Sequence, residues 1–142
     1  VHFTTFNCFE LANISDRAKY KSKIDLLIAS EYNRDIEYFS NIVESSSRDL
    51  HCYVVQSNNA EYGDNRIYSP SKEKYERDIV KVKGGENSTL LVGTLDIKKL
   101  REFQIKEYEL QRSDRFFKPT PPDYDKQIVK ERISNSEDLE RE

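Results

Sequence analysis

Hydrophobic positions fall into short runs that predict a series of β-strands. The stretch "VHFTTFN" at the start of the chain is rich in β-branched and aromatic residues, as is typical of a strand. The continuous apolar runs "IDLLIAS" and "CYVVQS" predict strands that are buried on both faces. Shorter strands are predicted for "RIYSP", which Pro70 ends, and for the alternating stretch "DIVKVK". A further strand is predicted for "STLLVGTLDI".

Between the strands, polar caps and helical spacing predict helices. "ISDRAKYKSK" is predicted to be helical, with Ser15 or Asp16 as its N-cap. The longer stretch "NRDIEYFSNIVESSSRDL" places apolar residues at helical spacing, with Asn33 or Asp35 as the cap.

The order of these elements predicts the fold class. Two β-α units and a third strand are followed by short strands and an amphipathic helix, "KKLREFQIKEYEL". Leu100, Phe103 and Tyr108 are predicted to share one face of that helix. This order predicts an α/β fold with a mixed sheet and helices on one face, as an open half rather than a closed fold.

The apolar runs are unevenly distributed, which divides the chain in two. Only 36% of the 142 residues are hydrophobic and 35% are charged. Residues 1–110 hold nearly all the aliphatic runs, whereas residues 111–142 are charged and contain "PTPP". The second part is predicted to be an extension that stays solvated or disordered until a partner orders it. Within it, "DYDKQIVKERI" could form one helical segment with Ile128 and Ile133 as apolar anchors.

Charge and cysteine content narrow the classes of function and the setting. A net charge of -3 and a pI near 5.6 give no basic field, so nucleic acid is expected as a partner only through a fused domain. No run approaches the roughly 18 apolar residues of a membrane span. Two cysteines are too few for a disulfide scaffold, so a cytoplasmic setting is expected. Because the sequence starts at Val1 and has no Met, we expect it to be a piece of a longer protein.

The stretch "FNCFEL" holds the main chemical candidate, Cys8, at the end of an apolar run and just before an acid. A free cysteine is most often a buried structural residue, but it can also be a nucleophile in electropositive surroundings. Both readings of Cys8 stay open, whereas Cys52 is expected in the core. His2 and His51 lack ligand spacing, so neither a metal site nor a cofactor is expected.

Five stretches in sequence order together resemble the C-terminal half of a carbon–nitrogen hydrolase (nitrilase superfamily) domain, over about residues 3–105. They are "FNCFEL", "DLLIAS", "RDLHCYVVQSN", "GDNRIYSP" and "LLVGTLDIKKLREF". Cys8-Phe9-Glu10 matches the family's Cys–aromatic–acid motif, although the family usually has aspartate where this chain has Glu10. The strand that ends at Asn58 matches the family's pattern. Two positions depart from it: Asp49 stands where the family has glutamate, and Asn65 stands where the family has serine. The "CFEL" form also resembles nitrilase-like domains fused behind reverse transcriptases in bacterial antiviral systems.

The resemblance implies a fold and an activity. The fold would be half of an α-β-β-α sandwich, and Cys8 would be the nucleophile of a Glu–Lys–Cys triad that cleaves a small amide or nitrile. In the family the glutamate and lysine come from the N-terminal half of the domain, so this chain alone is expected to be inactive. Glu31, Tyr32 and Asn33 would form a turn beside the site, and together with Glu10 they are the predicted residues of the substrate pocket.

Three points stay open under this resemblance. Glu10 or Glu31 could replace the missing base. In the family, however, the acid at the position of Glu10 has a structural role. The partner of the chain would be the missing N-terminal half or a second copy in a homo-oligomer. The alternative function is a nitrilase-like module without catalysis, serving in assembly or ligand sensing.

Overall fold

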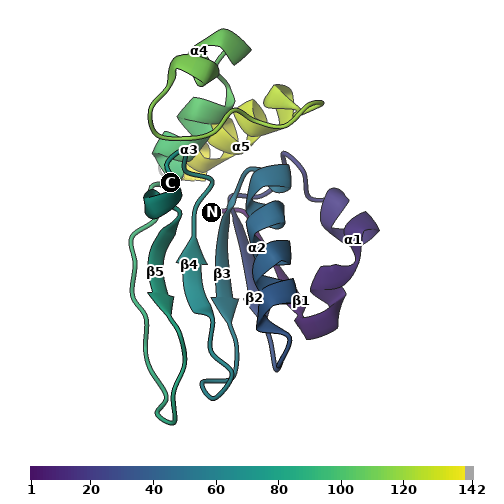
Figure 1. Ribbon diagram of the computed structural model, residues 1–142. Coiled ribbons are helices and arrows are strands. Elements are labelled where there is room, and N and C mark those ends of the chain that lie inside the picture. The colour runs from purple at the N-terminus through teal and green to yellow at the C-terminus, as the bar shows by residue number, and fades with distance from the viewer. Residues whose placement is uncertain (140–142) are drawn as a thin grey trace.

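The computed structural model of the protein describes residues 1–139 (Figure 1). Its elements follow one another in this order: β1 (Phe3–Asn7), the 3-10 helix η1 (Cys8–Ala12), α1 (Ile14–Ala18), β2 (Leu26–Ser30), α2 (Ile36–Leu50), β3 (Tyr53–Ser57), β4 (Asn65–Tyr68), the 3-10 helix η2 (Lys74–Glu76), β5 (Asp78–Val82), α3 (Ile97–Gln104), α4 (Tyr108–Ser113) and α5 (Lys126–Leu139).

The strands form one five-stranded sheet in the order β1-β2-β3-β4-β5. β1, β2 and β3 run parallel, with α1 and α2 in the connections between them. β4 and β5 are each antiparallel to the strand before them. The predicted α/β class with a mixed sheet is therefore confirmed, and the sheet is open, with β1 and β5 at its edges.

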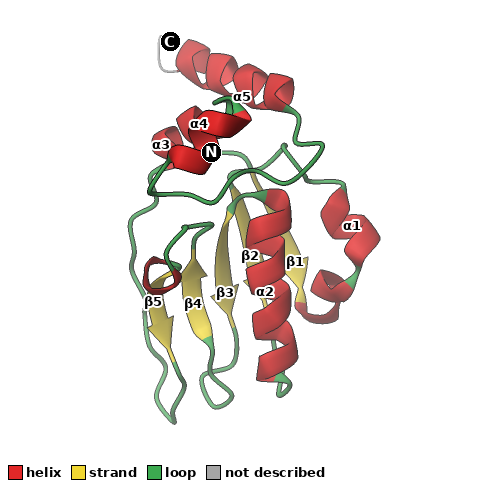
Figure 2. Cartoon of the chain, turned by 45° about the horizontal axis from the view of Figure 1, so that its top comes forward, coloured by secondary structure: helices red, strands yellow, loops and turns green. Residues whose placement is uncertain are grey.

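One face of the sheet is covered by α2 (Figure 2). The apolar stripe of this helix packs on alternate residues of β2 and β3, as the sequence predicts. Asp35, one of the two predicted caps, accepts a hydrogen bond from the backbone N–H of Tyr38 (3.4 Å). The buried core on this side consists of Phe6, Leu11, Ile24, Leu27, Ala29, Phe39, Ile42, Val43, Leu50, Cys52, Val54 and Tyr68.

The first helix is shorter than predicted, and its cap lies earlier in the sequence. α1 covers only five residues. The side chain of Asn13 accepts from the backbone N–H of Asp16 (3.3 Å), so Asn13 is the N-cap. The prediction of Ser15 or Asp16 as the cap is wrong, because the helix already begins at Ile14.

The opposite face of the sheet carries no helix along most of its length in the described part of the chain (Figures 1 and 2). At one end of this face, Tyr53 and Leu26 belong to a second buried cluster that includes residues of α3. In β2, Leu27 and Ala29 are fully buried against α2, whereas Leu26 and Ile28 are only half-buried. Phe3 on β1 keeps 60% of its surface exposed. The prediction that "IDLLIAS" is buried on both faces is wrong for this chain by itself, because α2 covers only every second residue.

The stretch "STLLVGTLDI" is not a strand in the structure. It lies against side chains of β4 and β5, since a Cβ on Gly93 would come within 2.9 Å of Ile67 Cδ1. The side chains of Leu90 and Val92, two residues apart, are 88% and 77% exposed. The predicted strand is wrong because the apolar run touches the sheet through side chains, without a strand ladder.

α3, α4 and α5 gather at the end of the sheet where β1, β2 and β3 begin (Figure 1). The single helix predicted for "KKLREFQIKEYEL" is divided into α3 and α4. The side chain of Gln111 donates to three carbonyls at the end of α3, those of Phe103, Gln104 and Lys106. Leu100 and Phe103 are buried as predicted, but Tyr108 is 57% exposed.

The C-terminal extension packs on the rest of the chain over its described part. Phe117 and Val129 are buried, and Phe117 contacts the stacked rings of His51 and Phe103. Burial lowers the pKa of the His51 imidazole to about 4, so at pH 7 the ring packs as a neutral aromatic. The prediction of a solvated or disordered extension is wrong for these residues, because the domain itself supplies the apolar cover.

Charged residues make the deepest contact between the extension and the sheet. Ile128 and Ile133, the predicted anchors, are only half-buried. Asp25 at the start of β2 is fully buried and accepts from Arg101 of α3 (2.6 and 2.8 Å) and from Arg132 of α5. Both arginines are also buried. This ionic cluster holds α3 and α5 against the sheet.

Candidate active site

The parallel strands bring the candidate residues to one end of the sheet. β1, β2 and β3 all finish at this end, and β4 begins there. Cys8 follows β1, residues 31–33 follow β2, Asn58 follows β3, and Asn65 opens β4. The carboxyl ends of parallel strands are the usual place for a site in open α/β sheets.

Cys8 is the first residue of η1, at the sharp turn that follows β1. Its backbone has a φ of 45°, in the left-handed region that residues other than glycine rarely adopt. The side chain is half-buried. Its Sγ atom lies 3.9 Å from the carbonyl oxygen of Tyr32 and 3.9 Å from Nδ2 of Asn33. The fold therefore brings together three of the predicted site residues.

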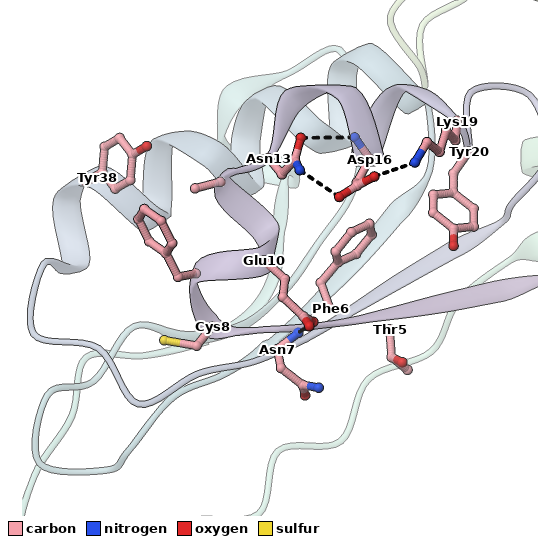
Figure 3. Close-up of a pocket in the computed structure, with 12 residues that line it drawn as sticks. Thr5, Phe6, Asn7, Cys8, Glu10, Asn13, Asp16, Lys19, Tyr20 and Tyr38 are labelled. Carbon is pink, nitrogen blue, oxygen red and sulfur yellow. Dashed lines mark hydrogen bonds and ion pairs between the residues drawn. The ribbon is translucent and has the colours of Figure 1, made fainter.

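A groove of about 890 Å³ runs along the outer side of β1, between that strand, η1 and α1. Cys8 and Tyr38 lie at one end, and Lys19 and Tyr20 lie at the other (Figure 3). Glu10 also lines the groove, whereas the other three predicted pocket residues do not.

Glu10 has a structural role in this arrangement. Its Oε2 accepts a hydrogen bond from the backbone N–H of Asn7 (2.9 Å), which ties the start of η1 to the end of β1 (Figure 3). A carboxylate at the third position of a helix commonly satisfies an N–H group in this way. The contact stabilises the turn on which Cys8 lies.

Glu31 is buried and belongs to a different network. Its Oε2 accepts from Gln56 (3.0 Å), and Gln56 in turn accepts from Nε of Arg66 (3.1 Å). Arg66 donates to Ser40 of α2. Burial raises the pKa of Glu31, and its Oε1 has no hydrogen-bond partner among the described residues. These contacts place its carboxylate among the polar side chains beneath α2.

Asn58 joins the two loops beside Cys8. Its side chain accepts from the backbone N–H of Asn33 (2.9 Å) and donates to the carbonyls of Asn33 (2.9 Å) and Gly63 (3.1 Å). The backbone N–H of Asn58 donates to Asn65 Oδ1 (2.7 Å). The sequence marks both asparagines only through the family resemblance, and the structure shows that they fix the loop that carries Asn33.

The tips of these loops form an exposed aromatic pair that the sequence does not indicate. The rings of Tyr32 and Tyr62 meet edge to face at 5.5 Å, and Nε of Arg34 donates to the Tyr62 hydroxyl (3.0 Å). Tyr32 is 68% exposed. No local spacing links Tyr62 to Tyr32, which lies 30 residues earlier.

The remaining chemical candidates lie elsewhere. Cys52 is fully buried in the core, as predicted, and burial raises the pKa of its thiol. His2 and His51 lie in separate surroundings, next to Arg101 and Lys118 respectively. Among the described residues, no group of three or more His, Cys, Asp or Glu side chains could hold a metal ion.

No protein-family model and no curated protein sequence matches this chain. Within residues 1–139, none of the helices has the length and apolar character needed to cross a membrane.

Proposed function

We propose that the chain is part of a carbon–nitrogen hydrolase that cleaves an amide or nitrile, with Cys8 as the nucleophile. The observation that carries this proposal is the strained backbone at Cys8, a residue that lines one end of an open groove. Such backbone strain costs about 1–3 kcal/mol and clusters at functional sites. A structural thiol needs neither the strain nor the groove, as Cys52 illustrates.

The reaction requires a base and a cation beside the thiol. With an amide, the Cys8 thiolate would attack the carbonyl carbon, form a C–S bond and expel ammonia or an amine, which takes up a proton. With a nitrile, it would add to the nitrile carbon while the nitrogen takes up a proton, and water would release ammonia from the resulting thioimidate to leave the same thioester. Water would then cleave the thioester and restore the thiol. Among the described residues, Sγ contacts only an amide nitrogen and a carbonyl oxygen, and neither of these can accept its proton. The glutamate and lysine of the family's triad are accordingly proposed to lie outside this chain.

Asn33 is proposed to donate a hydrogen bond within the site. Its Nδ2 lies close to Sγ and is held in place through Asn58. An amide N–H there could stabilise the thiolate or the oxyanion that develops on the substrate. Removal of one oxyanion donor typically lowers the rate by roughly a hundredfold to a thousandfold.

A nitrilase-like module without catalysis is the second candidate. The two acids considered as local bases both have other hydrogen-bond partners, Glu10 at the Asn7 N–H and Glu31 at Gln56. Such a module would serve in assembly or ligand sensing, including within a reverse-transcriptase antiviral protein. For both candidates we propose a cytoplasmic setting.

The uncovered sheet face is proposed to pack on another polypeptide sheet, from the missing half of the domain or from a second copy. Phe3, Leu90 and Val92 are all more than half exposed on or beside this face, and exposed apolar side chains on an uncovered sheet face suit an interface. We expect the isolated chain to associate at micromolar concentration in sedimentation experiments. A stable monomer with a cooperative melt and no binding of an apolar dye would contradict this expectation.

Alkylation tests whether Cys8 is presented to reagents as a nucleophile. In the complete protein, iodoacetamide is expected to modify Cys8 while Cys52 stays unmodified, because Cys8 is half-buried and lines the groove whereas Cys52 is fully buried. Peptide mass spectrometry over time would give both rates, and a denatured sample would show that both cysteines can react. Equally slow labelling of the two native thiols would favour a structural role for Cys8.

A further inference from the structure

Three cations from separate segments converge beside the end of β4, and we call them the cation cluster. They are Arg48 in the last turn of α2, Arg77 just before β5, and Lys118 between α4 and α5. All three are half-buried. Because β4 runs antiparallel to β3, the last residue of β4 lies at the end of the sheet where β1, β2 and β3 begin. Cys8 lies at the other end of the sheet.

Hydrogen bonds to the main chain hold the three segments together. The Lys118 N–H donates to the Pro70 carbonyl (3.1 Å), and Nε of Arg77 donates to the Ser71 carbonyl (3.2 Å). The His51 ring at the end of α2 lies 2.7 Å from the Lys118 carbonyl. The cluster is therefore built by the packed fold.

No member of the cation cluster forms an ion pair within residues 1–139. The charges of Asp49 and Glu73 act on it, but neither acid lies within ion-pair distance. Repulsion from Arg48, together with burial and the charge of Arg77, lowers the pKa of Lys118. The chain has 26 acidic and 23 basic side chains, so a shortage of acids does not explain the unpaired charges.

The cluster also contains an unsatisfied donor. Nη1 of Arg48 is buried and has no hydrogen-bond partner among the described residues. A buried donor without a partner lowers stability, and a charged donor does so more strongly. Repulsion among the cations adds to this cost. An anion with several oxygen atoms would relieve both effects.

We propose that the cation cluster binds a phosphate group. The Arg48 guanidinium offers forked donors that suit phosphate oxygens, and the Lys118 ammonium adds a point charge. Arg77 contributes mainly its charge, because its Nε and Nη2 already donate to the Ser71 and Lys72 carbonyls. Three cations match the double negative charge of a phosphate better than the single charge of a carboxylate. The phosphate group could belong to inorganic phosphate, a nucleotide or the terminal phosphate of a nucleic-acid strand. This local site is compatible with the negative net charge of the chain.

Thermal unfolding at constant ionic strength tests the proposal. Inorganic phosphate is expected to raise the melting temperature of the protein, because a ligand that binds only the folded state stabilises it. Lys118→Gln and Arg48→Gln are expected to weaken phosphate binding at least tenfold in calorimetric titrations. Among the described residues, neither charged group has a hydrogen-bond partner, so both variants should fold and should melt no lower than the wild type without phosphate. Lys130→Gln, an exposed change of equal charge on α5, is the matched control.

Separate titrations with adenosine monophosphate and a short single-stranded oligonucleotide distinguish the sources of the phosphate group. Tighter binding of either one than of inorganic phosphate would identify that source, provided that Lys118→Gln abolishes the difference. The proposal is overturned if phosphate leaves the wild-type melting temperature unchanged. It is also overturned if all three variants respond to phosphate as the wild type does.

Discussion

Replacement of Asp25 by alanine is expected to lower the free energy of unfolding by about 3–5 kcal/mol, the range for removing one partner of a buried ion pair. The substitution would leave Arg101 and Arg132 buried without their shared carboxylate. It would also remove the acceptor for the His2 N–H (2.8 Å). Chemical denaturation of both proteins would measure the loss.

The pKa of Asp25 sets the pH range of this contribution. Burial raises the pKa, but hydrogen bonds from Arg101 and His2 and the charges of both arginines lower it overall. An acid with a lowered pKa in the folded state stabilises the fold above its ordinary pKa of 3.8. Its contribution is lost as the pH falls below that value, so the difference between wild type and Asp25→Ala should persist at pH 5–8 and shrink in stronger acid.

Asp16→Ala is the matched control, because Asp16 makes an exposed ion pair with Lys19 on α1. Exposed pairs contribute little to stability, so this variant should unfold close to the wild type. An Asp25→Ala protein that unfolds at the same denaturant concentration as Asp16→Ala would show that the buried cluster does not hold α3 and α5 in place.

The sequence predicts the elements whose signal is local. The five strands of the sheet and the helix α2 follow from apolar runs, helical spacing and a cap at Asp35. The division of α3 from α4 was not predicted, because it depends on the side chain of Gln111 meeting carbonyls of a preceding helix. The apolar run at Leu90 and Val92 has the composition of a strand, but no neighbouring strand pairs with it.

The packing of the C-terminal extension was missed for a related reason. Its composition is charged, which predicts solvation, but Arg132 reaches a single buried carboxylate 107 residues earlier in the chain. A charge pattern does not show that a distant Asp25 will be buried at the start of a strand. Composition therefore predicts the wrong state, because the packing depends on distant contacts: the Arg132–Asp25 ion pair and the burial of Phe117 against His51 and Phe103.

The candidate site was predicted in part. Cys8, Tyr32 and Asn33 were named from the sequence, and they meet because β1 and β2 are parallel neighbours. Tyr62 and Arg34 could not be found, because the loops that carry them lie 25 to 30 residues apart and meet through Asn58, the Arg34–Tyr62 hydrogen bond and the edge-to-face tyrosine pair. The strained φ at Cys8 likewise belongs to the folded turn.

The second large effect is expected at Cys8. In the complete protein, Cys8→Ala should lower the rate of amide or nitrile hydrolysis by roughly 10⁴-fold or more, the range for loss of a catalytic nucleophile. Cys52→Ala is the matched control, because it also removes a thiol but lies in the core beneath α2. That variant should lose stability and keep its turnover number at temperatures where it stays folded. This chain alone should be inactive, since no base or cation contacts Sγ in its described part.

The most direct measurement is the turnover number on a panel of small amides and nitriles, for the complete protein, its Cys8→Ala and Cys52→Ala variants, and this chain alone. The expected result is hydrolysis by the complete protein and by Cys52→Ala, with none by Cys8→Ala or by the chain alone. Hydrolysis that survives in the Cys8→Ala protein would contradict the assignment of Cys8 as the nucleophile. Turnover by this chain alone that Cys8→Ala abolishes would contradict the placement of the base and cation outside it.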